Sequence, residues 1–81
     1  NNNSFIIYPN PNRGRFYIEF FTNQNKLTLS ITDIMGKNIY FKEDYTNIIK
    51  QEIILDRFTG GTYIININSN GINYSKPIII H

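Results

Sequence analysis

The side chains that could do acid–base chemistry or bind a metal are few in this chain of 81 residues. It has six carboxylates, one histidine and no cysteine. The histidine is His81, and residues at a chain end are seldom held in place. Asp33 and Asp56 stand in turn-like segments, where aspartate bonds nearby backbone amides. Without a metal-ligand spacing or a phosphate-binding pattern around Gly60–Gly61, the sequence predicts a protein that is not an enzyme and needs no cofactor or metal.

Two features point to binding instead. Isoleucine doublets such as Ile53–Ile54 recur, and neighbours in a strand point to opposite faces. The outward isoleucines are either scattered surface residues, which are normal, or they form one apolar face that docks on another protein. Pro77 predicts an edge strand. The edge over Ser75–Ile80 would then either add a strand from a partner or a second copy of the chain, or be protected against such pairing.

The elements that must position these residues are strands. Isoleucine, phenylalanine and tyrosine dominate the apolar residues, while alanine and valine are absent, and this composition favours a pleated surface over a helix. Alternating or continuous apolar runs predict seven strands, at Phe5–Tyr8, Phe16–Phe21, Leu27–Thr32, Ile39–Lys42, Glu52–Leu55, Tyr63–Asn68 and Ile72–Ile80. We therefore expect a small antiparallel β-sandwich of immunoglobulin type, with a barrel as the alternative.

The breaks between these runs carry turn chemistry. Pro9–Gly14 holds two prolines and a glycine, so it cannot pair along a ladder. Asp33–Lys37 predicts a type I turn with a left-handed residue at Gly36, which gives a bulged hairpin. Phe58, in the connection before the sixth run, is expected to plug an end of the core.

Charge and length exclude further classes. Eight basic and six acidic residues give a net charge of +2, and they are scattered, so no stripe for nucleic acid is present. No segment has the ~18 apolar residues of a membrane helix. A domain of this size buries only about 60% of its unfolded surface, so without disulfides it depends on a tightly packed core.

Four motifs follow one another along the chain, and together they resemble a known family. They are Tyr8–Pro11 with Gly14–Ile18, Leu29–Lys37, Ile53–Leu55 with Gly61–Ile65, and Lys76–Ile80. In this order and spacing they resemble the type A C-terminal sorting domains of the type IX (Por) secretion system of Bacteroidetes. The resemblance covers about residues 5–80. Thr32 stands where the family often has an aromatic residue, and Pro77 where it often has a basic one.

The resemblance implies a non-catalytic address that directs a cargo protein across the outer membrane. Residues 1–4 would be the end of a linker to an N-terminal cargo, and residues 5–81 the sorting domain. The implied partners are the type IX translocon and its shuttle proteins, and a sortase-like peptidase that cuts in the linker and removes the domain. The implied route passes through the periplasm to the medium or the cell surface.

Twelve motif residues are candidates for recognition by this machinery. They are Pro9, Asn10, Pro11, Gly14, Asp33, Gly36, Lys37, Gly61, Tyr63, Lys76, Ile78 and Ile80. Most also have a structural explanation, because prolines and glycines set backbone angles and Tyr63 is expected to pack inward. Lys37 and Lys76 are the better candidates for receptor contact, since packing is not expected to need them.

Two other functions remain open at this point. The first is a carbohydrate-binding or adhesion module of immunoglobulin type, in which tyrosines such as Tyr17, Tyr40 and Tyr74 would stack on sugars. Tyrosine is also an ordinary cross-strand packing residue. The second is a structural spacer, which would be found in tandem copies.

Overall fold

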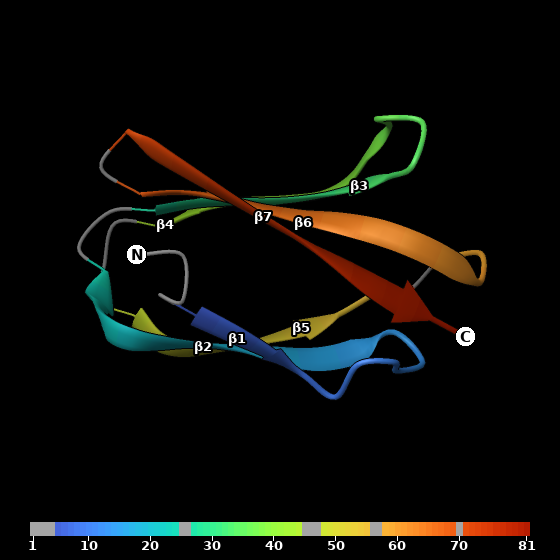
Figure 1. The fold of residues 1–81 in the computed structure, drawn as a ribbon, viewed down its shortest axis with the longest axis horizontal. Helices are drawn as coiled ribbons and strands as arrows, with labels where there is room; N and C mark the ends of the chain where they lie inside the picture. Colours follow the sequence, from blue (N-terminus) through green and yellow to red (C-terminus); the bar gives the residue numbers. More distant parts are fainter. Residues whose placement is uncertain (1–4, 25–26, 45–47, 56–57, 70) are drawn as a thin grey trace.

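The computed structural model describes residues 5–24, 27–44, 48–55, 58–69 and 71–81. It contains seven strands, namely β1 (Phe5–Tyr8), β2 (Arg15–Gln24), β3 (Leu27–Asp33), β4 (Asn38–Asp44), β5 (Ile48–Ile54), β6 (Gly61–Ser69) and β7 (Ile72–Ile80). They form two antiparallel sheets, ordered β1-β2-β5 and β4-β3-β6-β7. The sheets face each other as two layers (Figure 1). The predicted sandwich is therefore confirmed and the barrel is not formed, while the predicted linker, Asn1–Ser4, lies outside the described residues.

The core lies between the two layers and is built by the period-2 alternation of the strands. In each strand, alternate side chains point inward. Their burial removes apolar surface from water, and this is the main favourable contribution to the free energy of folding. The buried apolar side chains are Phe5, Phe16, Ile18, Phe20, Leu27, Leu29, Ile31, Ile53, Leu55, Tyr63, Ile65, Ile67, Ile78 and Ile80. Phe58 packs against this cluster, as predicted.

The isoleucine doublets split between core and surface. Ile53 is fully buried, while its neighbour Ile54 is 58% exposed. Ile54 pairs with Arg15 on the sheet β1-β2-β5, whereas the exposed Ile79 pairs with Thr62 on the other sheet. The outward isoleucines are thus divided between the two sheets. This favours the interpretation that they are ordinary surface residues and do not form one apolar docking face.

A bulge in β4 breaks the alternation that the sequence indicated there. Alternation alone places Ile39 and Phe41 on one face, but the register shifts where Ile31 pairs with Tyr40 and Thr32 with Asn38. The extra residue, Ile39, and its neighbour Tyr40 both pack against the core. Phe41 is left 60% exposed.

The open side of the sandwich, between the edge strands β1 and β7, is closed by the loop Pro9–Gly14. The backbone N–H of Asn12 donates to the carbonyl of Ile79 at 3.0 Å, and the carbonyl of Asn12 accepts from His81 at 2.8 Å. The side chain of Asn10 accepts from the N–H of Ile79 at 3.0 Å. The loop therefore acts as a short additional strand at the end of β7.

These bonds also decide between the two interpretations of the β7 edge. Pro77 lies on an edge strand, as predicted. The N–H and C=O of Ile79 both point outward, and in an antiparallel strand every second residue shares that direction. Pro77 thus turns its missing donor outward, and Ile79 is already bonded to the loop. The end of β7 is protected against strand addition rather than open to it.

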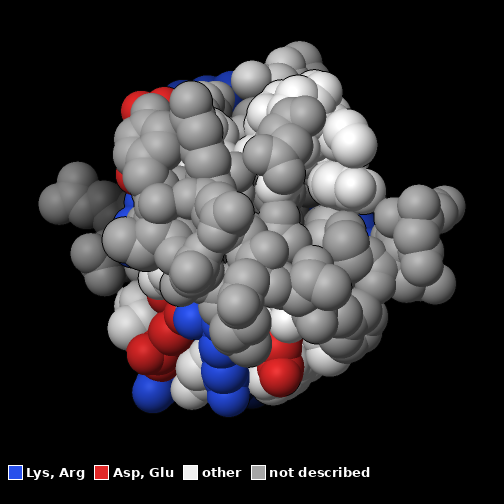
Figure 2. Space-filling view, turned by 90° about the vertical axis from the view of Figure 1, so that its left-hand side faces the viewer, with Lys and Arg blue, Asp and Glu red and all other residues white. Residues whose placement is uncertain are grey.

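Charged and polar side chains on the outer face of the sheet β1-β2-β5 are paired with one another. On the sheet β1-β2-β5, Arg15 pairs with Glu52 at 2.6 Å, and the hydroxyl of Tyr8 donates to Glu19 at 2.6 Å. That bond to Glu19 raises the pKa of Tyr8. Figure 2 shows acidic and basic side chains next to one another along its lower edge, where this sheet lies. The charges on this face are therefore largely matched within the domain.

The two residues of one doublet give a matched test of this core. Ile53→Ala should lower the free energy of unfolding by about 3 kcal/mol, because it leaves a cavity at a fully buried site. Ile54→Ala should change it by less than about 0.5 kcal/mol, because the side chain lies on the surface. Urea unfolding followed by circular dichroism measures both values. Equal losses for the two variants would contradict the register in which Ile53 points inward and Ile54 outward.

The loop that closes the open side can be tested in the same way. Asn12 is buried, and its side chain accepts from Gly14 N–H at 2.7 Å and donates to the carbonyl of Pro9 at 3.0 Å. Asn12→Ala should cost about 2 kcal/mol, because a buried donor loses its acceptor, and lower the melting temperature by about 10 °C.

Asn10→Ala is the control, since Asn10 is exposed and caps a single amide. It should cost only about 0.5 kcal/mol. Thermal unfolding of both variants would show whether the buried asparagine is the one that closes the loop. A larger loss for Asn10→Ala would overturn that assignment.

Candidate recognition end of the sandwich

Four segments far apart in the sequence meet at one end of the sandwich, the right-hand end in Figure 1. They are the β1–β2 loop Pro9–Gly14, the β3–β4 turn Asp33–Lys37, the β5–β6 segment Phe58–Tyr63 and the end of β7, Ile78–His81. We call this end the motif pole. Eleven of the twelve predicted recognition residues lie there, and the exception is Lys76. The structure therefore brings together the residues that the sequence motifs singled out.

Direct contacts connect these segments. The N–H of Leu55 donates to the carbonyl of Gly14 at 2.8 Å, which ties the β1–β2 loop to the segment after β5. The ring of Phe58 lies against Gly14, so that an added Cβ would come within 2.3 Å of that ring. Gly14 also has a φ of 100°, which other residues rarely adopt. A glycine is thus required there by both backbone angle and close packing.

The β3–β4 turn forms as predicted. One carboxylate oxygen of Asp33, Oδ1, accepts from the N–H groups of Met35 and Lys37, both at 2.9 Å. Gly36 takes the left-handed conformation, with a φ of 89°. The tight turn leaves no room for its two central side chains in the core, and Ile34 and Met35 are 72% and 86% exposed.

Tyr63 holds the segment that leads into β6. Its ring is buried, and its hydroxyl donates to the carbonyl of Thr59 and accepts from the N–H of Thr59 at 3.1 Å. A tyrosine suits this position because its body is apolar and its tip satisfies two backbone groups. The prediction that Tyr63 packs inward is confirmed.

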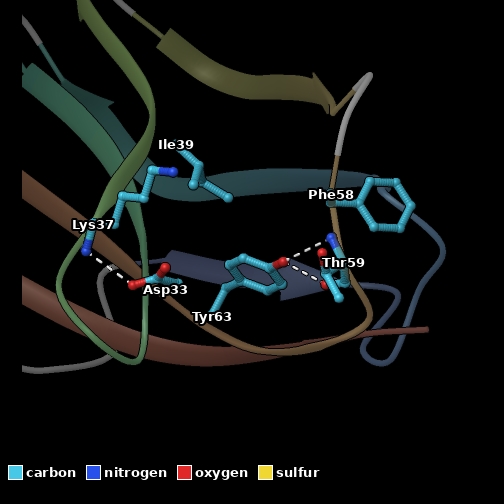
Figure 3. A pocket seen from close by; sticks show the side chains of 6 residues that line it. All are labelled: Asp33, Lys37, Ile39, Phe58, Thr59 and Tyr63. Atoms are coloured by element: carbon cyan, nitrogen blue, oxygen red, sulfur yellow. Dashed lines mark hydrogen bonds between the residues drawn. The ribbon is translucent and has the colours of Figure 1, made fainter.

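A pocket of about 380 Å³ opens between the turn and this segment. It is lined by Asp33, Lys37, Ile39, Phe58, Thr59 and Tyr63. Figure 3 shows the ring of Tyr63 between Asp33 and Lys37 on one side and Phe58 and Thr59 on the other. The lining combines apolar side chains with the carboxylate of Asp33, the ammonium of Lys37 and the hydroxyl groups of Thr59 and Tyr63. The pocket can therefore hold an apolar group and contact a charge beside it.

The two lysines that were expected to be free of packing differ. The ammonium of Lys76 donates to the carbonyl of Phe5 at 2.7 Å and lies 4.6 Å from the centre of its ring. Lys76 therefore links β7 to β1, and the expectation that the fold does not need it is wrong. Lys37 is exposed, and its ammonium has no bonded partner among the residues that the structure describes.

The tyrosines of the rival sugar-binding interpretation do not share a face. Tyr17 lies on the outer face of the sheet β1-β2-β5, beneath the ammonium of Lys50 at 4.8 Å. Tyr40 and Tyr74 instead pack against the core, and Tyr74 meets the ring of Phe5 edge-on. Burial raises the pKa of the Tyr40 hydroxyl. These three rings therefore do not form one platform.

Several residues of the motif pole were missed by sequence reasoning. Asn12 holds the β1–β2 loop, Thr59 lines the pocket, and Ile34 and Met35 are the exposed tip of the turn. Nothing in a single sequence separates Asn12 from Asn10, because both are asparagines next to Pro11. The exposed tip carried a signal, since two apolar residues stand inside a predicted turn.

Within the described residues, no group of three or more His, Cys, Asp or Glu side chains could hold a metal ion. The same part of the chain contains no helix long and apolar enough to cross a membrane.

Of the comparisons with known proteins, the one with protein families gives a match. No curated protein matches the chain significantly. A family model described as "Secretion system C-terminal sorting domain" matches residues 6–81, which is nearly the whole chain. The match includes the four segments of the motif pole, and it agrees with the resemblance carried by the sequence motifs. The chain thus belongs to the family of C-terminal sorting domains of the type IX secretion system.

Proposed function

We propose that this domain is the address by which the type IX machinery exports a covalently attached cargo, and that the machinery reads the motif pole of the folded domain. The observation that carries the proposal is the convergence of eleven motif residues at one end of a sandwich that matches the sorting family over residues 6–81. The domain itself does no chemistry. Its contribution is a surface that a partner binds.

The path of the chain supports this use of the pole. β1 begins at Phe5 and runs toward the motif pole, so the cargo, attached before Phe5, joins the sandwich away from the pole. A partner can then contact the pole without meeting the cargo. The closed β7 edge supports a contact through side chains and loops rather than through an added strand.

The proposed route follows from this role. The cargo enters the periplasm by its own signal, and the folded domain then binds a shuttle protein or the translocon. The cargo and the attached domain cross the outer membrane together. A sortase-like peptidase then cuts before Phe5, within the linker. The absence of cysteine suits this route, because the domain reaches its folded state without disulfide oxidation.

The proposal is tested by export of a fluorescent protein that carries a periplasmic signal at its N-terminus and this chain at its C-terminus. In a bacterium with a type IX system, most of the fluorescence should reach the medium or cell surface. It should stay in the periplasm when the chain is omitted or when the translocon is deleted.

Ile53→Ala is the folding control in this assay, because it removes core packing and no surface group. Its export should fall with the folded fraction. Export that is unchanged in the translocon deletion would refute the proposed function. Full export of an unfolded variant would refute reading of the folded pole.

A further inference from the structure

We propose that the pocket of the motif pole holds one apolar side chain of an acidic peptide segment that a partner protein presents, and that Lys37 pairs with a carboxylate of that segment. The proposal rests on the proposed function and names the chemistry of the contact. The size of the pocket, the charges at its mouth and the apolar side chains beside it support this assignment.

The size and lining of the pocket select the group it takes. At about 380 Å³ it lies near the lower end of ligand pockets, so it suits a side chain better than a cofactor. Ile39, Phe58 and Tyr63 give it apolar walls. An aromatic or large aliphatic side chain would fill it and exclude water, as anchor residues do at protein interfaces.

The charged side chains at the mouth of the pocket favour an acidic residue next to the apolar side chain that the pocket holds. One carboxylate oxygen of Asp33 is occupied by two N–H groups of its own turn, which hold this carboxylate within the turn. Lys37 has no bonded partner in the part of the chain that is described, and the same holds for Arg13, which is exposed in the β1–β2 loop of the same pole. The sheet β1-β2-β5 differs, since Arg15 is paired there with Glu52. Unpaired cations favour a negatively charged partner.

The side chains next to the pocket indicate a macromolecule rather than a free small molecule. Ile34 and Met35 extend from the same turn that supplies Asp33 and Lys37, and both are largely exposed. They extend the apolar surface beyond the pocket, which a small ligand would not cover. Methionine is adaptable at binding surfaces, because its unbranched chain fills irregular gaps. A peptide segment that spans the pocket and this tip accounts for all of these features.

The charge preference can be measured with three small probes that share a phenyl group. These are 3-phenylpropionate, 3-phenylpropanamide and 3-phenylpropylamine, each titrated into the ¹⁵N-labelled chain and followed by NMR. We expect saturable shifts at the amides of Lys37, Ile39, Thr59 and Tyr63, with a roughly millimolar Kd for the carboxylate. The carboxylate should bind about tenfold more tightly than the amine.

Lys37→Gln should abolish that preference, while the matched variant Lys50→Gln, on the outer face of the sheet β1-β2-β5, should keep it. Shifts that are absent, that fall elsewhere, or that favour the amine overturn the proposal. Shifts at the pocket that grow with protein concentration alone would mean that a second copy of the chain is the occupant, which also overturns it.

Export separates this inference from the proposed function. Lys37→Gln and Thr59→Trp, which fills the mouth of the pocket, should both reduce export of the fluorescent cargo, while Lys50→Gln should not. Thermal unfolding is expected to be unchanged, because Lys37 and Thr59 are exposed. If the unaltered chain is not exported, the proposed function fails. If the unaltered chain is exported, and Lys37→Gln and Thr59→Trp are exported as well as it is, only the pocket inference fails.

Discussion

The structure depends on closing the open side of a small sandwich that has no disulfide to do so. Two β-sheets packed face to face leave an opening between their edge strands, here β1 and β7. Asn12 closes it at one end through backbone bonds to Ile79 and His81. Lys76 closes it further along, through the carbonyl of Phe5. Each net bond contributes only about 1 kcal/mol, but for a domain of this size such contributions are a large share of the total.

This closure also positions the surface that we assign to recognition. The loop that binds the end of β7 places Gly14 under the ring of Phe58, and the carbonyl of Gly14 bonds to Leu55. Phe58 is followed by Thr59, which Tyr63 holds by its hydroxyl. The pocket wall is therefore continuous with the contacts that hold the sheets together. Motif residues that look purely structural shape the surface that a partner would meet.

The sequence predicted the fold class, the seven strands, the β3–β4 turn and the inward position of Tyr63, because these follow from local alternation and turn chemistry. It did not predict the β4 bulge, since one inserted residue changes which of Ile39 and Phe41 faces inward and leaves the composition unchanged. It also misjudged Lys76, whose partner Phe5 lies at the other end of the sequence. Contacts of this range depend on how the two sheets are placed, which alternation within a strand does not specify.

The sequence predicted which residues belong to the candidate site, but not that they lie together at one end of the sandwich. The motifs named eleven residues of the motif pole, but only the topology shows that they meet at one end. Asn12 and Thr59 were missed, because their roles are exerted through backbone groups of distant segments. Ile34 and Met35 were not among the predicted recognition residues, although two apolar residues at the tip of a predicted turn have no packing role there.

The central claim is that the export machinery contacts the motif pole of the folded domain. Photo-crosslinking in exporting cells tests it most directly, with p-benzoylphenylalanine placed at Met35 or at Ile72. Both side chains are exposed, but Met35 lies at the motif pole, whereas Ile72 begins β7 at the opposite end of the sandwich. Our account predicts a crosslink from Met35 to a component of the type IX machinery, identified by mass spectrometry, and none from Ile72. A crosslink to that machinery from Ile72 and not from Met35 would contradict it.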